Sequence, residues 1–449
     1  MAVVVVFAST ICAATMAAAQ DPARDAAGVA RIWEAERGSY GPPALLNHAR
    51  LVPLVQAAVK EGAGLYKIEE IGQSLEGRSI NHIWFGTGQT HVLLWSQMHG
   101  DEPTATSALL DILHMVARHQ ADPPVQRLLS ELTIHFVPML NPDGAERFQR
   151  RNAQGIDINR DALLLQAPEG RALKALRDRL QPALGFNLHN QGWRTSAGKS
   201  KPASISLLAD AFDEERTLTP GRVLAKRACA IIRQAVEALA PAQVARYDDE
   251  FEVRAFGDNV TKWGTPVILI ETGPYAGEDA DRELVKLNVV AILTALDSLA
   301  TGAVQAADAA LYESLPINDS NLYTVIVKGA SIVAGTGIPP FTGDIALGSS
   351  RVVRTDTKGT REAFQALRVD DLGDMRVFSA LETVDAAGLF AVTNQGWKEG
   401  DTVQVADWKS LKSDTPLAVG STADIALLRP AAAGGYTVTR IIRTERKLQ

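Results

Sequence analysis

The amino-acid sequence, 449 residues long, predicts an α/β protein whose mostly parallel or mixed sheet carries helices on both faces. A β-rich C-terminal domain is expected to follow this unit. Three observations support the prediction. Apolar runs of strand length alternate with segments of helical periodicity as far as about residue 300. Potential ligands recur just after the strands, at His99, Asn141, His189 and Glu271. After residue 303, short strand-like runs among Gly-rich turns replace the helical pattern.

The first domain is assigned residues 20–302, and its elements follow from apolar spacing. Strands are expected at 66–71, 79–85, 91–98, 132–140, 183–189 and 265–270, and helices at 44–61, 105–119, 169–180, 220–239 and 283–299. Glycine-containing segments 72–78 and 86–89 are expected to be turns. Asn141-Pro142-Asp143-Gly144 is expected to break regular structure.

The second domain is assigned residues 303–449 and is expected to be rich in strands. Strands are expected at 323–333, 351–354, 389–392, 402–405 and 436–442. This part of the sequence contains no cluster of His, Cys or acidic residues that would indicate a second active site. Its role is left open between substrate binding, attachment to a partner and stabilisation of the first domain.

Bulk composition narrows the classes of function. A net charge of -7 gives no support for a nucleic acid or an anionic membrane as partner, because both require a basic surface. The sequence has two cysteines, Cys12 and Cys229, which excludes a disulfide scaffold and a cysteine-based zinc site. With 46% hydrophobic residues the chain has the composition of an ordinary globular protein.

The N-terminal segment is typical of a signal peptide. Residues 3–19 are apolar and small, and Ala17-Ala18-Ala19 precedes the polar residues that begin at Gln20. A basic start is missing, and the segment is short for a membrane span. We expect residues 1–19 to direct export to the periplasm or the medium, with no other membrane contact; the alternative is a buried N-terminal helix.

His99, Glu102 and His189 are candidate ligands of one zinc ion. His99 and Glu102 lie between the end of an expected strand and a helix that starts near Pro103, where open α/β sheets place their sites. A catalytic zinc ion is usually bound by two protein ligands that are close in sequence and a third that is distant. The alternative is a loop hydrogen bond and a helix cap around His99, with His189 as an ordinary loop residue.

Further polar residues complete a candidate site. The planar guanidinium of Arg160, beside the amide of Asn159, suits a carboxylate. The guanidinium of Arg150 could stabilise a developing oxyanion. The carboxylate of Asp157 could accept a hydrogen bond from the second ring N–H of a ligating histidine. Glu271 follows a wholly apolar strand, so burial should raise its pKa toward that of a general base. The alternatives are a charged surface loop at 150–160 and a helix cap or ion pair at Glu271.

In order and loop position, these motifs resemble those of the zinc metallocarboxypeptidases over residues 45–300. The matching motifs are Ile71 to Arg78, His99-x-x-Glu102, Asn141-Pro142-Asp143-Gly144, Arg150-x-Asn152-x-x-Gly155-x-Asp157-x-Asn159-Arg160, Leu188-His189 and Glu271-Thr272-Gly273. The resemblance implies an eight-stranded type of sheet, one zinc ion and hydrolysis of the C-terminal peptide bond of a peptide that has a free carboxylate.

The resemblance also implies a role for each matching residue. His99, Glu102 and His189 would hold the zinc ion, and Asp157 would orient His99. Glu271 would act as general base and then general acid, and Arg150 would polarise the scissile carbonyl. Asn159 and Arg160 would bind the terminal carboxylate. Arg151 is the alternative to Arg150 if the alignment slips by one residue.

Three features depart from the family pattern. Asn187 stands where the family usually has Asp, and Asn190-Gln191-Gly192 after His189 is unusual. An active-site tyrosine is matched by Tyr247 in broad position, but Phe256 fits the spacing to Glu271 equally well. The specificity pocket is expected to be lined by residues 255–262. Asp258 in that segment would favour a basic terminal side chain, unless it is a solvated loop residue.

Three alternative functions compete with that of a metallocarboxypeptidase. One is a zinc amidohydrolase of N-acyl amino acids, like aspartoacylase or succinylglutamate desuccinylase; Asn141 to Gly144 and the late Glu271-Thr272-Gly273 argue against it. The second is cleavage of cell-wall peptides at a D-amino acid. The third is an inactive binding module with the same fold, which the presence of all the expected ligands and of Glu271 disfavours.

Overall fold

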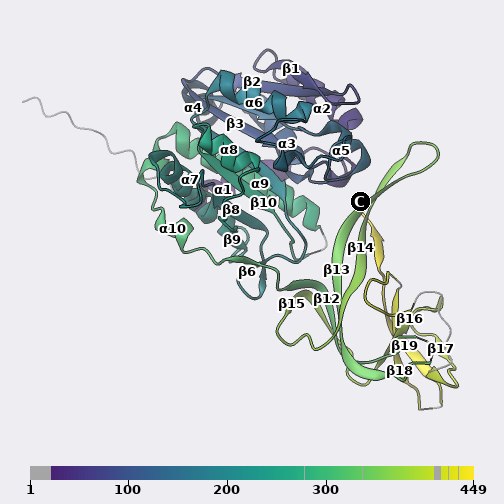
Figure 1. Cartoon of the computed structure of the whole chain (residues 1–449). Coiled ribbons are helices and arrows are strands. Elements are labelled where there is room, and N and C mark those ends of the chain that lie inside the picture. The colour runs from purple at the N-terminus through teal and green to yellow at the C-terminus, as the bar shows by residue number, and fades with distance from the viewer. Residues whose placement is uncertain are drawn as a thin grey trace, which may run out of the picture.

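The computed structural model describes residues 22–448, except residues 278, 336, 409–415, 423 and 433. The signal peptide predicted at residues 1–19 lies outside the described residues. Within the described ranges, no helix combines the length and the hydropathy that crossing a bilayer requires. Figure 1 shows two parts: an α/β domain formed by the first two-thirds of the chain, and an elongated β-rich region.

An eight-stranded sheet forms the centre of the α/β domain, with strand order β1-β2-β4-β3-β5-β10-β8-β9. The strands are β1 (Lys67–Gln73), β2 (Ser79–Gly86), β3 (Thr90–Ser96), β4 (Leu132–Val137), β5 (Leu184–Asn190), β8 (Ile205–Ala209), β9 (Val244–Arg246) and β10 (Val267–Thr272). The central pairs β4–β3, β3–β5 and β5–β10 are parallel, whereas β1–β2, β2–β4 and β10–β8 are antiparallel. The predicted mixed sheet is therefore confirmed.

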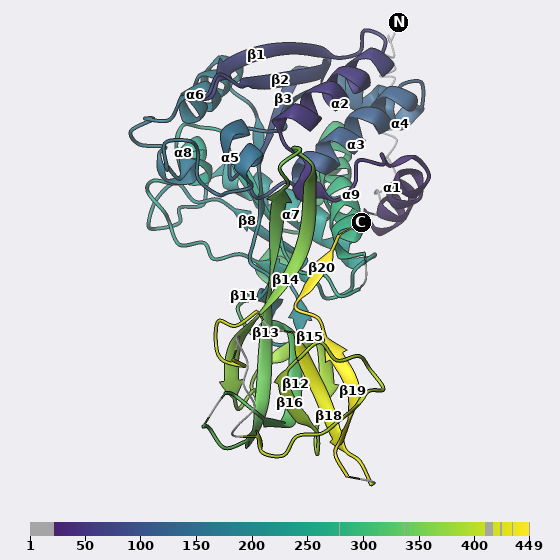
Figure 2. The same ribbon diagram turned by 90° about the vertical axis from the view of Figure 1, so that its right-hand side faces the viewer.

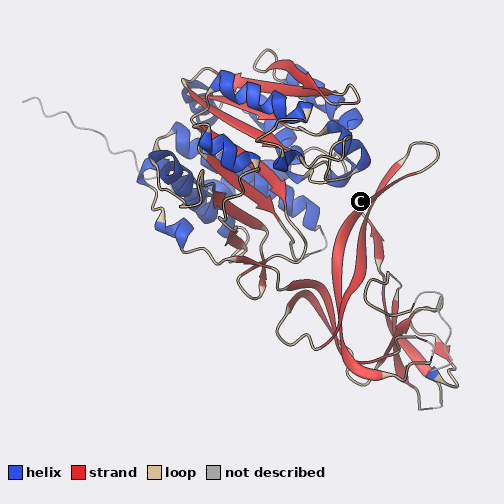
Figure 3. Cartoon of the chain, viewed as in Figure 1, coloured by secondary structure: helices blue, strands red, loops and turns tan. Residues whose placement is uncertain are grey.

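Helices cover both faces of this sheet (Figure 3). They are α1 (Pro22–Glu36), α2 (His48–Glu61), α3 (Thr104–Arg118), α4 (Pro123–Glu131), α5 (Pro142–Arg147), α6 (Pro168–Leu180), α7 (Pro220–Glu237), α8 (Phe256–Lys262), α9 (Ala280–Ala300) and α10 (Ala310–Glu313). Successive side chains of β3 point to opposite faces of the sheet, and each face has its own hydrophobic core. Val92 and Leu94 pack with α2, α3, α7 and α9, whereas Leu93 and Trp95 pack with α6 and α8.

Several of these elements were not predicted, and one prediction was wrong. A short helix, α5, begins directly after Asn141, where regular structure was expected to break. The side chain of Asn141 caps this helix by accepting a hydrogen bond from Gly144 N at 2.9 Å, and Pro142 occupies the first turn. Helices α1, α4 and α8 and strands β8 and β9 were also missed; α8 and β9 are short, with seven and three residues.

The β-rich region contains a nine-stranded sheet whose order is β17-β19-β18-β16-β12-β13-β14-β20, with β15 beside β12. Its strands are β12 (Leu322–Ile332), β13 (Phe341–Thr355), β14 (Arg361–Gly373), β15 (Ser379–Asp385), β16 (Phe390–Thr393), β17 (Thr402–Val403), β18 (Ile425–Pro430), β19 (Tyr436–Ile442) and β20 (Glu445–Lys447). The long β13–β14 hairpin runs back along the α/β domain (Figure 2). A β-rich C-terminal region is thus confirmed.

The two parts are connected by more than the chain. The 3-10 turn η3 (Ala303–Ala306) and α10 pack against α7, and the phenol of buried Tyr312 accepts a hydrogen bond from Ala209 N at 3.2 Å. Strand β11 (Asn318–Asp319) pairs with β6 (Ser196–Ala197), which in turn pairs with β7 (Lys201–Pro202). Near the hairpin tip, Arg361 lies 3.7 Å from the Glu146 carboxylate of α5.

Candidate functional site

Three buried side chains converge at the C-terminal edge of the central strands. His99 and Glu102 lie on the loop between β3 and α3, and His189 lies near the end of β5. Their donor atoms all lie within 4.8 Å of one another. Glu102 spans the two rings: its oxygens lie 2.8 Å from His99 Nδ1 and 2.7 Å from His189 Nδ1. The two Nδ1 atoms are 3.2 Å apart.

Local backbone structure holds the His99 loop in place. Gln97 adopts a φ of 50°, and its side chain donates to Gly100 O at 3.0 Å and accepts from Thr106 Oγ1 at 3.0 Å. Positive φ at a non-glycine residue is uncommon and concentrates at functional sites. Gly100 packs on the first turn of α5 so closely that a Cβ would lie 2.0 Å from Gly144 C. No larger residue fits at position 100 unless α5 moves.

Asp157 and Arg150 support the cluster from the loop that precedes η2 (Ile158–Arg160). Asp157 Oδ1 lies 3.1 Å from His99 Nε2, the ring nitrogen that faces away from Glu102. Arg150 Nε donates to Asp157 Oδ2 at 3.0 Å, and its Nη1 lies 3.4 Å from Glu102 Oε1. Arg151 instead donates to Gly155 O, within its own loop. Of the two arginines considered, the structure places Arg150 at the cluster.

The electrostatics of the cluster favour a positive charge. Burial opposes protonation of His99, but the carboxylate of Glu102 and the hydrogen bond to Asp157 raise the pKa of His99 to about 9. Burial likewise opposes ionisation of Glu102, yet His99 and His189 hold the pKa of Glu102 below its usual range. Two carboxylates therefore flank one imidazole in a nearly solvent-free setting. Such a setting suits a bound cation.

Glu271 lies directly beside this cluster. In the parallel pairing of β5 and β10 it is opposite His189, so both side chains leave the same face of the sheet. Burial, and then the charge of Glu102, raise the pKa of Glu271 well above its ordinary value. Its Oε2 is buried and has no hydrogen-bond partner among the described residues. A desolvated, unpartnered carboxyl group is what a proton-transfer step requires.

The residues expected to bind substrate lie on the loops around η2 and after β9. Asn159 Oδ1 accepts from Phe256 N at 2.8 Å, and Arg160 Nε lies 3.2 Å from Glu252 Oε2. Tyr247 is half-buried and follows β9. The neighbouring carboxylate of Glu271, together with burial, holds the pKa of Tyr247 above its usual range. Phe256 is fully buried in the core under α8, so of the two aromatic candidates Tyr247 faces the site.

Two further residues lie at the site: the sequence singled out Asn190 only as part of an unusual segment after His189, and it missed Asp210. Asn190 donates its backbone N–H to Glu102 Oε2 at 3.2 Å, and its side chain donates to Thr104 Oγ1 at 2.7 Å. Asp210 follows β8 and is buried, and burial and Asp258 raise its pKa well above the ordinary value. A polar residue after an apolar strand was the available signal for Asp210, but β8 had not been recognised.

Buried Asp210 and half-buried Asp258 form an acidic pair, and the charge of Glu271 also acts on Asp210. Burial raises the pKa of Asp258 to about 6, and its Oδ1 accepts from Glu252 N at 3.2 Å. Asp258 is therefore held by its own loop and is not a freely solvated side chain. Gly257 packs against the same group: a Cβ there would lie 2.0 Å from Asp210 Oδ2 and 3.3 Å from the Asn187 amide nitrogen.

The donor set fits a zinc ion. Two imidazole nitrogens and one carboxylate are the His₂Glu combination of catalytic zinc sites. The hydrogen bond from the remaining nitrogen of His99 to Asp157 is the usual support of a ligating histidine. His189 differs, because its Nε2 is buried and has no hydrogen-bond partner among the described residues.

Asp157→Asn tests the support of His99. The amide keeps the shape of the side chain but removes the charge that faces His99 and Arg150, so we expect zinc affinity to fall about tenfold. Titration of the apoprotein with zinc against a chromophoric chelator measures the effect. The control is Asp161→Asn, a buried residue that accepts from Gln166 N and Ala167 N and contacts none of the ligands. Equal affinities for the Asp157 variant and the wild type would exclude this role.

Comparisons with known proteins agree with the motifs. Residues 53–204 match the family model of the zinc carboxypeptidases, which confirms the resemblance. A probable carboxypeptidase 2 of Trichophyton verrucosum is 30% identical over 127 residues, 26% of this chain and 24% of that protein. Carboxypeptidase E of Caenorhabditis elegans is 31% identical over 149 residues, 28% of this chain and 30% of that protein. The matched segments thus span about a quarter of these relatives' length.

Solved structures of carboxypeptidases also align with the chain. A metallo-carboxypeptidase from Burkholderia cenocepacia aligns with a TM-score of 0.46 and 19% identity, over 57% of this chain and 69% of that one. A metallo-carboxypeptidase from Pseudomonas aeruginosa aligns with a TM-score of 0.45 and 20% identity over the same shares.

Proposed function

We propose that the protein is a zinc-dependent metallocarboxypeptidase that removes the C-terminal residue of peptides. The observation that supports this most directly is the buried cluster of His99, Glu102 and His189 with the unpartnered carboxyl group of Glu271 beside it. The family match over residues 53–204 gives the chemical class. A predicted signal peptide adds the proposal that the enzyme works in the periplasm or outside the cell.

In the proposed mechanism Glu271 carries the proton. A zinc ion held by His99, Glu102 and His189 supplies, when bound, a Lewis acid that acidifies water and polarises a carbonyl. Glu271 accepts the proton of the attacking water, and its burial keeps the carboxyl pKa high enough to return that proton to the leaving amine. Arg150, whose Nη1 lies beside Glu102, stabilises the negative charge that develops on the carbonyl oxygen.

The terminal residue of the substrate is proposed to lie toward η2. Arg160 is exposed and adjoins Asn159, whose side-chain oxygen is held by Phe256 N, so the amide N–H₂ of Asn159 is left to face a carboxylate. The charge of Glu271 contributes to the raised pKa of Tyr247, and this supports the proposal that the Tyr247 hydroxyl contacts the bound residue. The pair formed by buried Asp210 and half-buried Asp258 favours a basic terminal side chain.

A peptide library tests the proposal. Products are identified by mass spectrometry, with and without a zinc chelator, and we expect single residues to be released from the C-terminus only while zinc is available. Zinc returned to the chelated protein should restore release. N-acyl amino acids and cell-wall peptides are included as competing substrates. If these are cleaved and no peptide is trimmed, the carboxypeptidase assignment is wrong, although a zinc hydrolase remains.

A further inference from the structure

Helix α5 connects the loop that carries His99 with the loop that carries Arg150. The side-chain nitrogen of Asn141, the residue before the helix, donates to Met98 O at 3.2 Å, directly before His99. The same nitrogen lies 3.3 Å from Arg150 O. Gly100, directly after His99, packs on the first turn of α5. The position of α5 therefore bears on the backbone on both sides of one candidate zinc ligand and on the backbone of Arg150.

The other end of α5 is capped from the β-rich region. Arg361, the first residue of β14, donates from Nη1 to Glu146 O at 2.5 Å and from Nη2 to Ala145 O at 3.4 Å. The last carbonyl groups of a helix lack partners within it, and a basic side chain can satisfy them. The side chain of Arg361 is only 10% exposed. Removing it would leave helix carbonyls unsatisfied in a place that water hardly reaches.

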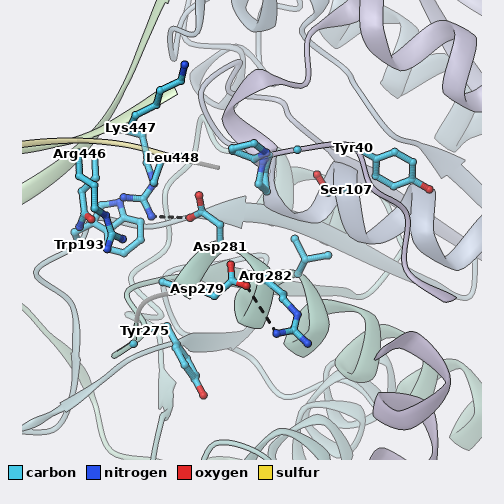
Figure 4. Close-up of a pocket in the computed structure, with 18 of the residues that line it drawn as sticks. Tyr40, Ser107, Trp193, Tyr275, Asp279, Asp281, Arg282, Arg446, Lys447 and Leu448 are labelled. Atoms are coloured by element: carbon cyan, nitrogen blue, oxygen red, sulfur yellow. Dashed lines mark hydrogen bonds and ion pairs between the residues drawn. The ribbon is translucent and has the colours of Figure 1, made fainter. Parts of the chain in front are cut away.

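The hairpin that carries Arg361 is attached to the α/β domain at a second place. On β13, Arg351 Nη2 lies 2.6 Å from Asp281 Oδ1 at the start of α9, and the guanidinium lies 4.1 Å from the ring centroid of Trp193. Both partners are labelled in Figure 4, on the wall of a cavity of about 940 Å³ between the two parts of the chain. The hairpin thus reaches α5 from an anchored stem, and its attachment does not depend on Arg361 alone.

We propose that Arg361 is a positioning residue of the metal site. It holds the C-terminal end of α5, and Asn141 at the other end of α5 passes this constraint to the backbone beside His99 and at Arg150. The inference rests on the proposed function and extends its zinc site to a residue 215 positions after Glu146. One role of the β-rich region is then to complete the active site of the α/β domain.

Arg361→Met tests the proposal, because methionine keeps much of the apolar stem and removes every donor. We expect the zinc affinity of the apoprotein to fall about fivefold, less than the roughly 10–100-fold loss that follows removal of a group bonded directly to a ligand. Competition with a chromophoric chelator measures this effect without any turnover. Arg361→Lys keeps the charge and one donor group, so it should recover part of the affinity.

Kinetics on one peptide give a second measurement on the same variant. We expect kcat to fall severalfold and KM to change little, because Asn159 and Arg160 contact Phe256 and Glu252 and not α5. A purely structural role of Arg361 would instead lower the melting temperature and leave the zinc affinity and kcat of the folded protein at their wild-type values.

Arg354→Met is the matched control. Arg354 lies on the same hairpin and is 57% exposed; it pairs with Glu445 of β20 and lies over the ring of Phe364, so its printed partners belong to the β-rich region. Zinc affinity and kcat should stay at wild-type values in this variant.

The outcomes separate this inference from the proposed function. Wild-type zinc affinity in folded Arg361→Met would overturn the positioning role and leave the carboxypeptidase proposal intact. Weaker zinc binding by the variant, with no peptide trimmed by the wild type, would support the positioning role and refute the proposed function. Melting temperatures check folding. If Arg361→Met does not fold, Arg361→Lys takes its place, and wild-type affinity in that variant overturns the inference.

Discussion

Glu271→Gln is expected to lower kcat about a thousandfold while zinc stays bound. General acid–base catalysis contributes about 10²–10⁴ to a rate, and the amide can neither accept the proton of water nor return it to the leaving amine. The side chain is buried and isosteric with glutamine, and its Oε2 makes no hydrogen bond to the described residues, so little stability should be lost. Steady-state kinetics on one peptide, with zinc content by metal analysis, measure both effects.

Glu169→Gln is the matched control for this variant. Glu169 is also fully buried, burial also raises its pKa, and its contact to Asn152 lies outside the cluster. Because glutamine mimics a protonated carboxyl group, this control should keep wild-type kcat. If Glu271→Gln turned over at the wild-type rate with zinc bound, another group would have to move the proton, and the mechanism proposed here would be wrong.

His189→Ala is expected to lower zinc affinity at least about a hundredfold and to abolish turnover at micromolar zinc. Loss of a direct ligand should exceed the roughly 10–100-fold loss that follows removal of a group supporting a ligand. His189 is buried and contributes one of three ligand atoms, and its contact to Glu102 also holds that carboxylate. Competition between the apoprotein and a chelator of known affinity reports zinc binding independently of catalysis.

His114→Ala is the control for that experiment. His114 lies on α3, pairs with Glu61 and is remote from the three ligands in all described contacts. Zinc affinity should be unchanged in this variant. Retained wild-type affinity in His189→Ala would show that the ion, if bound, is held by a different set of residues.

The position of the cluster was predictable because a general rule of open sheets places ligands after strand ends. His99, His189 and Glu271 each follow an apolar run that is clear in sequence, and the structure places all three at one edge of the sheet. The confirmed α/β fold follows from the same runs. Strand β8, with five residues, was not recognised, and Asp210 was missed with it.

Other features have no signal in the sequence. The N–H of Asn190 that holds Glu102 is a backbone group, which every residue except proline carries. Arg150 and Arg151 are adjacent and identical in type, so only the path of the loop tells them apart. Strands β13 and β14 are long but mostly half-exposed, and their burial does not alternate clearly, so an apolar period was not visible.

Contacts made by residues after 302 determine where the α/β domain could be cut from the rest of the chain. Tyr312 is buried and its hydroxyl accepts the N–H of Ala209, at the end of a strand that adjoins Asp210. A polypeptide cut after residue 302 would lose this phenol and leave both a hole beside α7 and an unpaired amide. Further along the chain, the side-chain amide of Asn318 donates a hydrogen bond to the side-chain oxygen of Gln191, the second residue after His189. An excised fragment would therefore need to extend beyond residue 319 to keep the loop after His189 in its native form.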